Sequence, residues 1–255
     1  MNDLSTMNDL STMTTEQARV AFGSAQIAVL PIGATEQHGH HLAVRTDTEI
    51  AYRFAAAITA ELGDAAVLCP TIPYGLSEHH VAFAGTLTLR PQTLRAILLD
   101  LAESIRHQGI HRIIVVNGHG GNIDAIRLAA REAKRDLGVE MAHVMWAPLA
   151  REEISAIVET GELHNHACEI ETSLALHLDP SLVRAEPVDD IDHQPIHPLA
   201  APPAGPIDFP QTFETFTASG ALGHPSRATA EIGEHLARAV LDRAVDFARW
   251  FATRP

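Results

Sequence analysis

Carboxylates and imidazoles are crowded into the stretch GATEQHGHHLAVRTDTEIA, residues 33–51. Glu36 and His38 are separated by one residue, and in an extended backbone such side chains point to the same side. Asp47 follows near the start of a predicted helix, where its carboxylate can reach back and offer one oxygen to each of two metal ions. Asp is also common as a helix N-cap, but beside Glu36 and His38 we favour a ligand role.

A second segment of this kind is VVNGHGGN, residues 115–122. His119 stands among glycines, which permit tight turns and close approach of the backbone to a ligand. The alternative is a glycine-rich connection from strand to helix with an incidental histidine. The segment matches neither the phosphate-binding P-loop nor the dinucleotide fingerprint.

A third segment, HACEIETS, places Glu169 and Glu171 at the start of a predicted helix, just after His166. The helix dipole favours carboxylates at this position, which is a structural reason for one of them. Across the three segments we expect five metal ligands, namely Glu36, His38, Asp47, His119 and Glu169. Such an oxygen-rich set suits Zn, Mn or Fe(II) rather than a closed structural zinc site. Two ions roughly 3.5–4 Å apart, bridged by a carboxylate, hold a hydroxide at neutral pH and polarise a carbonyl.

The elements that position these residues alternate along the chain. Apolar runs predict strands at 25–32, 65–69, 111–116 and 139–146, with a short alternating candidate at 86–89. Helical spacing predicts helices at 48–62, 91–107, 122–137, 169–178 and 228–251. This alternation predicts a mostly parallel sheet covered by helices on both faces, with ligand sites at the carboxyl ends of the strands.

Length and composition set the domain organisation. The chain has 255 residues and 46% hydrophobic residues, values of an ordinary globular domain, and we expect one domain over 15–255. MNDLST occurs at 1–6 and again at 7–12, so 1–14 is interpreted as a disordered or duplicated start and left out of the fold. The proline-rich stretch 185–225 is predicted to be a surface excursion, as a lid or a subunit contact.

Charge and apolar runs exclude some partners. The net charge is −14 and no cluster of Lys and Arg is present, so we expect no nucleic-acid partner. No apolar run has membrane-spanning length, and we expect no membrane partner. The two cysteines, Cys69 and Cys168, fit a reduced cytoplasmic setting.

The motifs together resemble a known family. GATEQHG, the downstream TD, YGLSEHH with FAGT, NGHGGN and HACEIETS occur in the order typical of the creatininase family of metal-dependent amidohydrolases, over roughly residues 25–180. The resemblance implies a three-layer α/β/α sandwich, a two-metal centre, hydrolysis of a small amide C–N bond, and often a homohexamer. It implies that Glu36, Asp47 and His119 bind one ion and that His38, Asp47 and a glutamate bind the other.

Two departures from creatininases proper concern the substrate. Their GHYEN pattern supplies the second-metal glutamate, whereas this chain has Gly120 and Gly121, so Glu169 is the expected replacement. The aromatic residue that would face creatinine is also absent, so creatinine is not the expected substrate. Relatives with the GHGGN pattern open formamide-type nucleotide intermediates or act as the peptidase-like maturase of the mycofactocin pathway.

Catalytic and substrate-binding roles are predicted beside the metals. We expect His166, or else Glu171, to act as general acid or base. Substrate contacts are expected from Ser77, His80, Gly120 and Gly121. Ser77 is equally interpretable as a turn serine, and the two glycine N–H groups are placed to hold an oxyanion.

The resulting hypothesis is a metal-dependent amidohydrolase that uses a metal-bridged hydroxide on a cyclic amide or formamide-like small molecule. We expect two divalent ions per subunit, Zn, Mn or Fe(II). The alternatives are a mycofactocin-type precursor peptide maturase and, from another class, a non-catalytic binding subunit that retains the fold.

Overall fold

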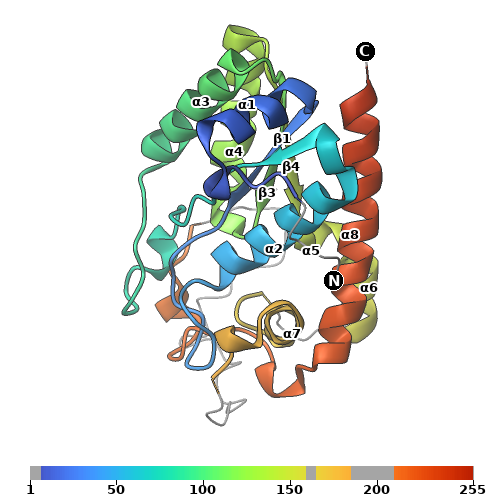
Figure 1. Cartoon of the computed structure of the whole chain (residues 1–255). Coiled ribbons are helices and arrows are strands. Elements are labelled where there is room, and N and C mark those ends of the chain that lie inside the picture. The colour runs from blue at the N-terminus through green and yellow to red at the C-terminus, as the bar shows by residue number, and fades with distance from the viewer. Residues whose placement is uncertain (1–6, 159–164, 185–209, 255) are drawn as a thin grey trace.

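The computed structural model describes residues 7–158, 165–184 and 210–254, and its centre is a parallel sheet (Figure 1). The strands are β1 (Ile27–Ile32), β2 (Ala66–Leu68), β3 (Arg112–Asn117) and β4 (Glu140–Met145). They pair in the order β2-β1-β3-β4, and every pair is parallel. The four main strand predictions are therefore confirmed. Residues 86–89 instead form only isolated bridges, from Leu87 to Thr35 and from Thr88 to Gly75.

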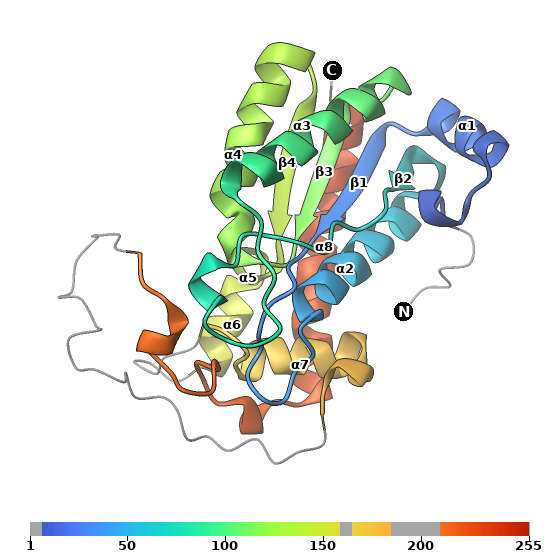
Figure 2. The same ribbon diagram turned by 90° about the vertical axis from the view of Figure 1, so that its left-hand side faces the viewer.

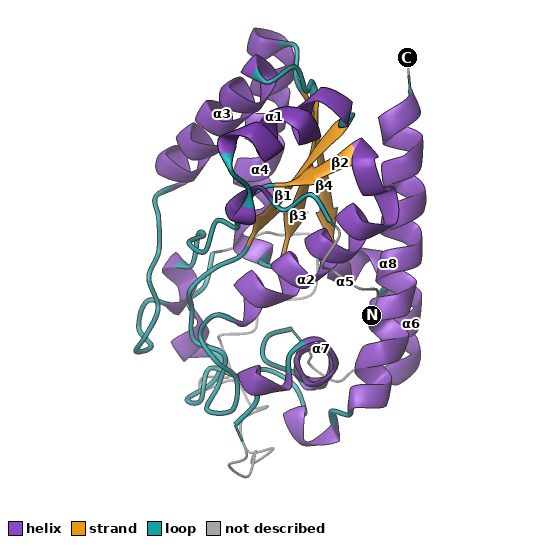
Figure 3. Ribbon diagram, viewed as in Figure 1, coloured by secondary structure: helices purple, strands orange, loops and turns teal. Residues whose placement is uncertain are grey.

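Helices cover both faces of the sheet, as the purple ribbons on either side of the orange strands show (Figure 3). On one side lie α1 (Thr15–Ser24), α3 (Pro91–His107) and α4 (Ile123–Glu132); on the other lie α2 (Thr46–Leu62) and α8 (Ala230–Thr253). Along β1, Ile27 and Val29 join the core with α2 and α8, whereas Ala28 and Leu30 join the core with α3 and α4. A strand buried on both faces reads as a continuous apolar run, and the predicted three-layer sandwich is confirmed.

Three helices were not predicted. These are α1 and the consecutive short helices α5 (Trp146–Leu149) and α6 (Arg151–Ile157), which follow β4 directly. A one-turn π-helix, Ala133–Leu137, extends α4 to Gly138, whose φ of 67° ends it in the left-handed region. Single turns of 3-10 helix lie at Leu10–Thr12, Gly63–Ala65, Glu78–His80, Gly120–Asn122, Pro180–Leu182, Phe213–Thr215 and Pro225–Arg227.

The described part of the amino-terminal segment belongs to the fold, contrary to its exclusion from the sequence-based prediction. The amide of Leu68 donates to the carbonyl of Asn8 (2.8 Å), and the Asn8 side chain donates to the carbonyl of Ala66 (3.2 Å). Residues 7–9 thus lie along β2 and cover part of the sheet edge. The first copy of the repeat, 1–6, lies outside the described residues.

Helix α7 (Glu169–Leu178) lies beyond the carboxyl ends of the strands, toward which the arrowheads of β3 and β4 point (Figure 2). It packs against α8, where Gly233 lies close to the carbonyl of Ser173. The loops that leave β1 and β3 therefore begin at the end of the sheet that faces α7. No helix in the described part of the chain is long and apolar enough to cross a membrane.

Candidate metal centre and active site

Glycines let the first turn of α2 lie close to the ends of two strands. A side chain on Gly33, after β1, would place its Cβ 2.3 Å from the amide nitrogen of Thr48. A side chain on Gly118, after β3, would place its Cβ 2.1 Å from the carbonyl oxygen of Asp47. Neither position tolerates a larger residue without movement of α2. This packing brings Asp47 to the carboxyl ends of β1 and β3.

Asp47 stands between two imidazoles. Its Oδ1 lies 3.1 Å from Nε2 of His38, and its Oδ2 lies 3.2 Å from Nδ1 of His119. The carboxylate is 2% exposed and caps no backbone N–H of α2. The N-cap alternative for Asp47 is therefore not what the structure shows. One oxygen toward each imidazole is the arrangement that a bridging carboxylate needs.

Glu36 has no hydrogen bond to either carboxylate oxygen from any described residue, although its side chain is fully buried. Its Oε1 lies 3.2 Å from Nδ1 of His119, 3.5 Å from Nε2 of His80 and 3.8 Å from Nδ1 of His166. Asp47 Oδ2 is likewise without a hydrogen bond among the described residues. A buried carboxylate that lacks partners is costly unless a cation compensates it.

Three imidazoles each donate one ring N–H to a backbone carbonyl. His38 donates Nδ1–H to the carbonyl of Glu36 (3.2 Å), His119 donates Nε2–H to the carbonyl of Leu76 (2.8 Å), and His166 donates Nε2–H to the carbonyl of Gln37 (2.7 Å). In a neutral ring the second nitrogen then carries a lone pair, and in all three rings it faces carboxylates. This is the arrangement typical of metal-binding histidines, because the backbone carbonyl fixes the tautomer and the ring orientation.

Glu171, rather than the expected Glu169, reaches this cluster. Glu171 Oε2 lies 3.8 Å from Nε2 of His38 and is held there by the amide of Ala167 (2.7 Å). Glu169 Oε2 instead accepts from the amide of His224 (2.8 Å). The reason is helical geometry, because residues two apart on a helix do not face the same way. The sequence correctly placed both glutamates at the start of the helix. The predicted ligand, Glu169, faces the loop at 223–224 rather than the cluster.

The side chains brought together fit divalent metal ions. Three groups have ligand atoms within 4.8 Å of one another: Glu36, Asp47 and His119; His38, His166 and Glu171; and Glu36, His80 and His166. The first contains the unpartnered oxygens of Glu36 and Asp47, and Asp47 also contacts His38 of the second. Mixed oxygen and imidazole ligands suit Zn, Mn or Fe(II).

The charges in the cluster depend on one another. Burial alone would lower the pKa of His38, but the carboxylates of Asp47 and Glu171 outweigh it and raise this pKa well above its ordinary value. For His119, burial is outweighed in the same way by Glu36 and Asp47, so its pKa is also well above normal. Burial would raise the pKa of Asp47 and Glu171, yet the nearby imidazoles lower both. The ionised forms of Asp47 and Glu171 are therefore stabilised by the neighbouring imidazoles.

A cavity of about 340 Å³ opens onto the cluster. It is lined by Asp47, Glu171 and His166, and by three predicted substrate contacts, His80, Gly120 and Gly121. Burial, followed by neighbouring imidazoles, lowers the pKa of both His80 and His166.

Ser77, the fourth predicted substrate contact, does not line this cavity. Its hydroxyl is buried and without a hydrogen bond among the described residues.

Phe213 is a cavity residue that sequence reasoning missed. Its ring lies 4.1 Å from the ring centroid of His80 and 5.1 Å from that of His166. It belongs to the predicted excursion 185–225, of which 185–209 lies outside the described residues. A phenylalanine in a proline-rich stretch without periodicity gives no signal that would place it at a site.

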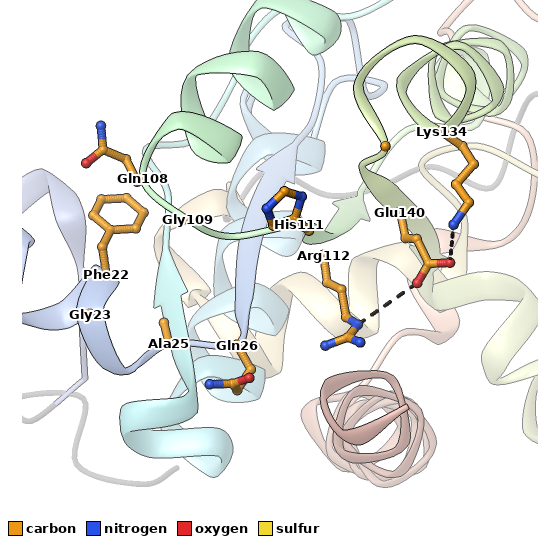
Figure 4. A pocket seen from close by; sticks show the side chains of 11 residues that line it. Phe22, Gly23, Ala25, Gln26, Gln108, Gly109, His111, Arg112, Lys134 and Glu140 are labelled. Atoms are coloured by element: carbon orange, nitrogen blue, oxygen red, sulfur yellow. Dashed lines mark hydrogen bonds and ion pairs between the residues drawn. The ribbon is translucent and has the colours of Figure 1, made fainter. Parts of the chain in front are cut away.

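A larger cavity of about 670 Å³ lies at the opposite end of the sheet, where Arg112 and Glu140 begin their strands (Figure 4). Glu140 is paired there with Lys134 (2.7 Å) and lies 4.0 Å from Arg112. The charged groups of this cavity thus satisfy one another and offer no ligand cluster. The chemistry concentrates at the carboxyl ends of the strands.

Comparison with known proteins agrees with this geometry. The family model for creatininase, described as creatinine amidohydrolase, matches residues 11–248. The chain belongs to the creatininase family. It is accordingly a hydrolase of C–N bonds, and the resemblance inferred from the motifs is confirmed.

Relatives within the family differ in substrate. The mycofactocin precursor peptide peptidase of Mycobacterium ulcerans (strain Agy99) is 31% identical over 255 residues, covering 96% of this chain and 92% of that protein. The creatinine amidohydrolase of Pseudomonas putida is 30% identical over 236 residues, covering 86% of each chain. A solved creatininase variant described as Zn-Zn type superposes with a TM-score of 0.80 and 27% identity, covering 98% of this chain and 100% of that one.

Proposed function

We propose that this chain is a two-metal amidohydrolase that cleaves the C–N bond of a small cyclic amide or formamide-like molecule. The carrying observation is Asp47, whose two oxygens face His38 at 3.1 Å and His119 at 3.2 Å. The unpartnered oxygens of Glu36 support the same proposal, because a cation beside them would offset the cost of their burial.

The two ions would share Asp47 and otherwise have different ligands in this proposal. Glu36, Asp47 and His119 would hold one ion, and His38, Asp47 and Glu171 would hold the other. Glu171 takes the place that the sequence-based prediction gave to Glu169. Zn, Mn or Fe(II) in such a site lowers the pKa of water and polarises a carbonyl oxygen.

The remaining cavity residues would act on the substrate. His166 turns Nδ1 toward Glu36 while its Nε2–H is held by the Gln37 carbonyl, so Nδ1 is available to accept a proton. The amides of Gly120 and Gly121 line the cavity and are available to an oxyanion. Phe213 packs against the rings of His80 and His166.

A second candidate function is the removal of a short peptide from a ribosomal precursor. The observation that favours it is the 31% identity with the mycofactocin precursor peptide peptidase of M. ulcerans over 96% of this chain. The same metal ligands would serve either reaction, because both cleave an amide. A non-catalytic binding subunit is disfavoured, because it has no need for unpartnered buried carboxylates.

An assay panel separates these functions. Protein loaded with Zn or with Mn is offered lactams, formamides and short peptides, with Asp47→Asn as the inactive control. We expect hydrolysis of a lactam or formamide by the loaded protein and none by the variant. Cleavage of peptides alone would favour the maturase, and no cleavage by fully loaded protein would favour the binding subunit.

The family resemblance also supports a homohexamer as part of the proposal, and the two free cysteines fit a cytoplasmic setting. Light scattering of the purified protein tests the hexamer, and a monomeric mass would exclude it.

A further inference from the structure

His80 has the opposite hydrogen-bonding arrangement to the other imidazoles of the site, and Gln37 is the reason. The side-chain amide of Gln37 is buried, and two backbone groups fix its orientation. Nε2 donates to the carbonyl of Gly220 (3.0 Å), and Oε1 accepts from the amide of Gly39 (2.9 Å). If the amide oxygen and nitrogen were exchanged, the oxygen would face the Gly220 carbonyl and the NH2 group would face the Gly39 N–H, so neither hydrogen bond could form. The hydrogen bonds therefore fix one orientation.

The fixed amide determines which ring nitrogen of His80 carries hydrogen. Gln37 Nε2 lies 2.8 Å from Nδ1 of His80 and has a hydrogen to donate, so Nδ1 must be the acceptor. The hydrogen of the neutral ring is then on Nε2. That nitrogen lies 3.5 Å from Glu36 Oε1, on a ring that lines the cavity.

This tautomer separates His80 from the metal ligands. Distances alone allow Glu36, His80 and His166 to hold an ion. A nitrogen that carries hydrogen has no lone pair for a metal, however, and His80 Nε2 is the nitrogen that faces Glu36. In their neutral forms, which a metal requires, His38, His119 and His166 turn a lone pair toward the carboxylates, whereas neutral His80 turns an N–H toward them.

Gly220 makes the arrangement possible. Its φ is +88°, and a Cβ on it would lie 1.9 Å from Oε1 of Gln37. Only glycine fits there, and its carbonyl is the acceptor that orients the Gln37 amide. The segment that contains Phe213 and Gly220 thus both covers the ring of His80 and fixes its hydrogen through Gln37.

We propose that Gln37 is a positioning residue that keeps the ring hydrogen of His80 on Nε2, and that this N–H donates a hydrogen bond to the carbonyl oxygen of the bound amide. The second part rests on the proposed function, because it assumes an amide in this cavity. The first part stands on the hydrogen bonds of the protein alone. A donor beside the oxygen on which negative charge develops contributes to rate without joining the metal centre.

Nitrogen-15 spectra of the imidazoles in zinc-loaded protein test the tautomer, with His80 assigned by its loss in His80→Asn. In the wild type we expect His80 Nδ1 to resonate as an unprotonated nitrogen and Nε2 as a protonated one. In Gln37→Glu the Gly39 contact is kept, but the carboxylate cannot donate, so Nδ1 should move to the shift of a protonated nitrogen. His143, which faces Asn117 outside the cavity, is the internal control and should not change.

Two results would overturn the role of Gln37: a protonated Nδ1 of His80 in the wild type, or an unchanged Nδ1 in Gln37→Glu. Addition of 2-pyrrolidinone, a small lactam, tests the donor role, and we expect the Hε2 proton of His80 to shift downfield in the wild type. An unchanged Hε2 signal would contradict that role. Zinc stoichiometry is measured on the same samples. A changed tautomer of His80 with zinc content unchanged is thereby distinguished from loss of the metal centre itself.

Discussion

The buried carboxylates have more accepting oxygens than the described residues satisfy. Glu36 Oε1 and Oε2 and Asp47 Oδ2 receive no hydrogen bond, and the nearest imidazole of His119 presents a lone pair when its Nε2–H is given to Leu76. Lone pairs facing lone pairs repel unless a proton or a metal ion lies between them. These unpartnered oxygens therefore favour a cation-binding site over a buried polar cluster without a ligand.

The two glutamates at the start of α7 form a matched pair for testing the second ion. Glu171→Gln removes a charge 3.8 Å from His38, so we expect metal content to fall from about two ions per chain to about one. Glu169→Gln changes a carboxylate that contacts His224 instead, and both ions should remain. Elemental analysis by mass spectrometry gives the counts. Loss of an ion in the Glu169 variant alone would restore the original sequence-based ligand set.

Metal binding should release protons. In the metal-free protein the carboxylates raise the pKa of His38 and that of His119 well above normal, which favours a second proton on each ring, whereas the lowered pKa values of Asp47 and Glu171 favour ionised carboxylates. A metal must displace those ring protons. Zinc affinity should therefore rise with pH until the raised histidine pKa values are passed, and fall as the pH is lowered.

Calorimetric titration with zinc in two buffers of different ionisation enthalpy measures this release. We expect the observed heat to differ between the buffers. Equal heats would mean that no proton leaves, and that the rings are already neutral before binding.

At the scale of elements, strands that are buried on both faces were predictable because they read as apolar runs, as in Ile27–Ile32. Helix α1 was missed because only Ala21 of its residues is buried, so it has a weak apolar stripe. Helices α5 and α6 are short and continue directly from β4, without a loop signal between them. Local pattern therefore predicted the strands and the long helices, and missed the short helices and the weakly amphipathic α1.

The site was also predictable only in part. Glu36, His38 and His119 lie in the loops that leave β1 and β3, and the carboxyl ends of parallel strands lie at one edge of the sheet, so their meeting was predictable. The choice between Glu169 and Glu171 depends on the rotation of α7 about its axis, which no local pattern sets. Phe213 depends on a segment that returns from far along the chain.

The close approach of the β3 loop to α2 predicts different effects for two neighbouring glycines. Gly118→Ala would place a Cβ 2.1 Å from the Asp47 carbonyl, which must shift the first turn of α2. We expect a loss of about 1–3 kcal/mol in stability and weaker zinc binding by roughly 10–100-fold, similar to loss of a supporting contact.

Gly120→Ala is the control, because a Cβ there meets no atom within 4 Å. Its melting temperature and zinc affinity should match the wild type. Chemical denaturation and competition with a zinc chelator measure both quantities. Equal behaviour of the two variants would show that the glycine contact does not position Asp47.

At the scale of the whole molecule, the site joins segments that are far apart in the sequence. Gln37 accepts from His166 and donates to Gly220, while Asn122 links the carbonyl of Gly33 (3.0 Å) to the amide of Leu76 (2.9 Å). Metal ions bound where these segments meet would stabilise the folded protein. In the unfolded chain the ligands are far apart and do not bind the ions.

Chelation should therefore destabilise the protein. With free zinc at about 100 times its dissociation constant, binding adds about 2.7 kcal/mol, so removing it with a chelator should lower the melting temperature by roughly 5–10 °C at this chain length. Calorimetry with and without chelator measures the shift, and Asp47→Asn should show almost none. Identical melting of zinc-loaded and chelated wild type would argue that the cluster is a polar core.

The most direct measurement is the zinc content of saturated, desalted protein in the wild type and in Asp47→Asn. Because Asp47 contacts both His38 and His119, a shared carboxylate requires that both ions depend on it. We predict about two zinc ions per chain in the wild type and near-complete loss of both in the variant. A single ion in the wild type, or two retained in Asp47→Asn, would contradict a centre bridged by Asp47.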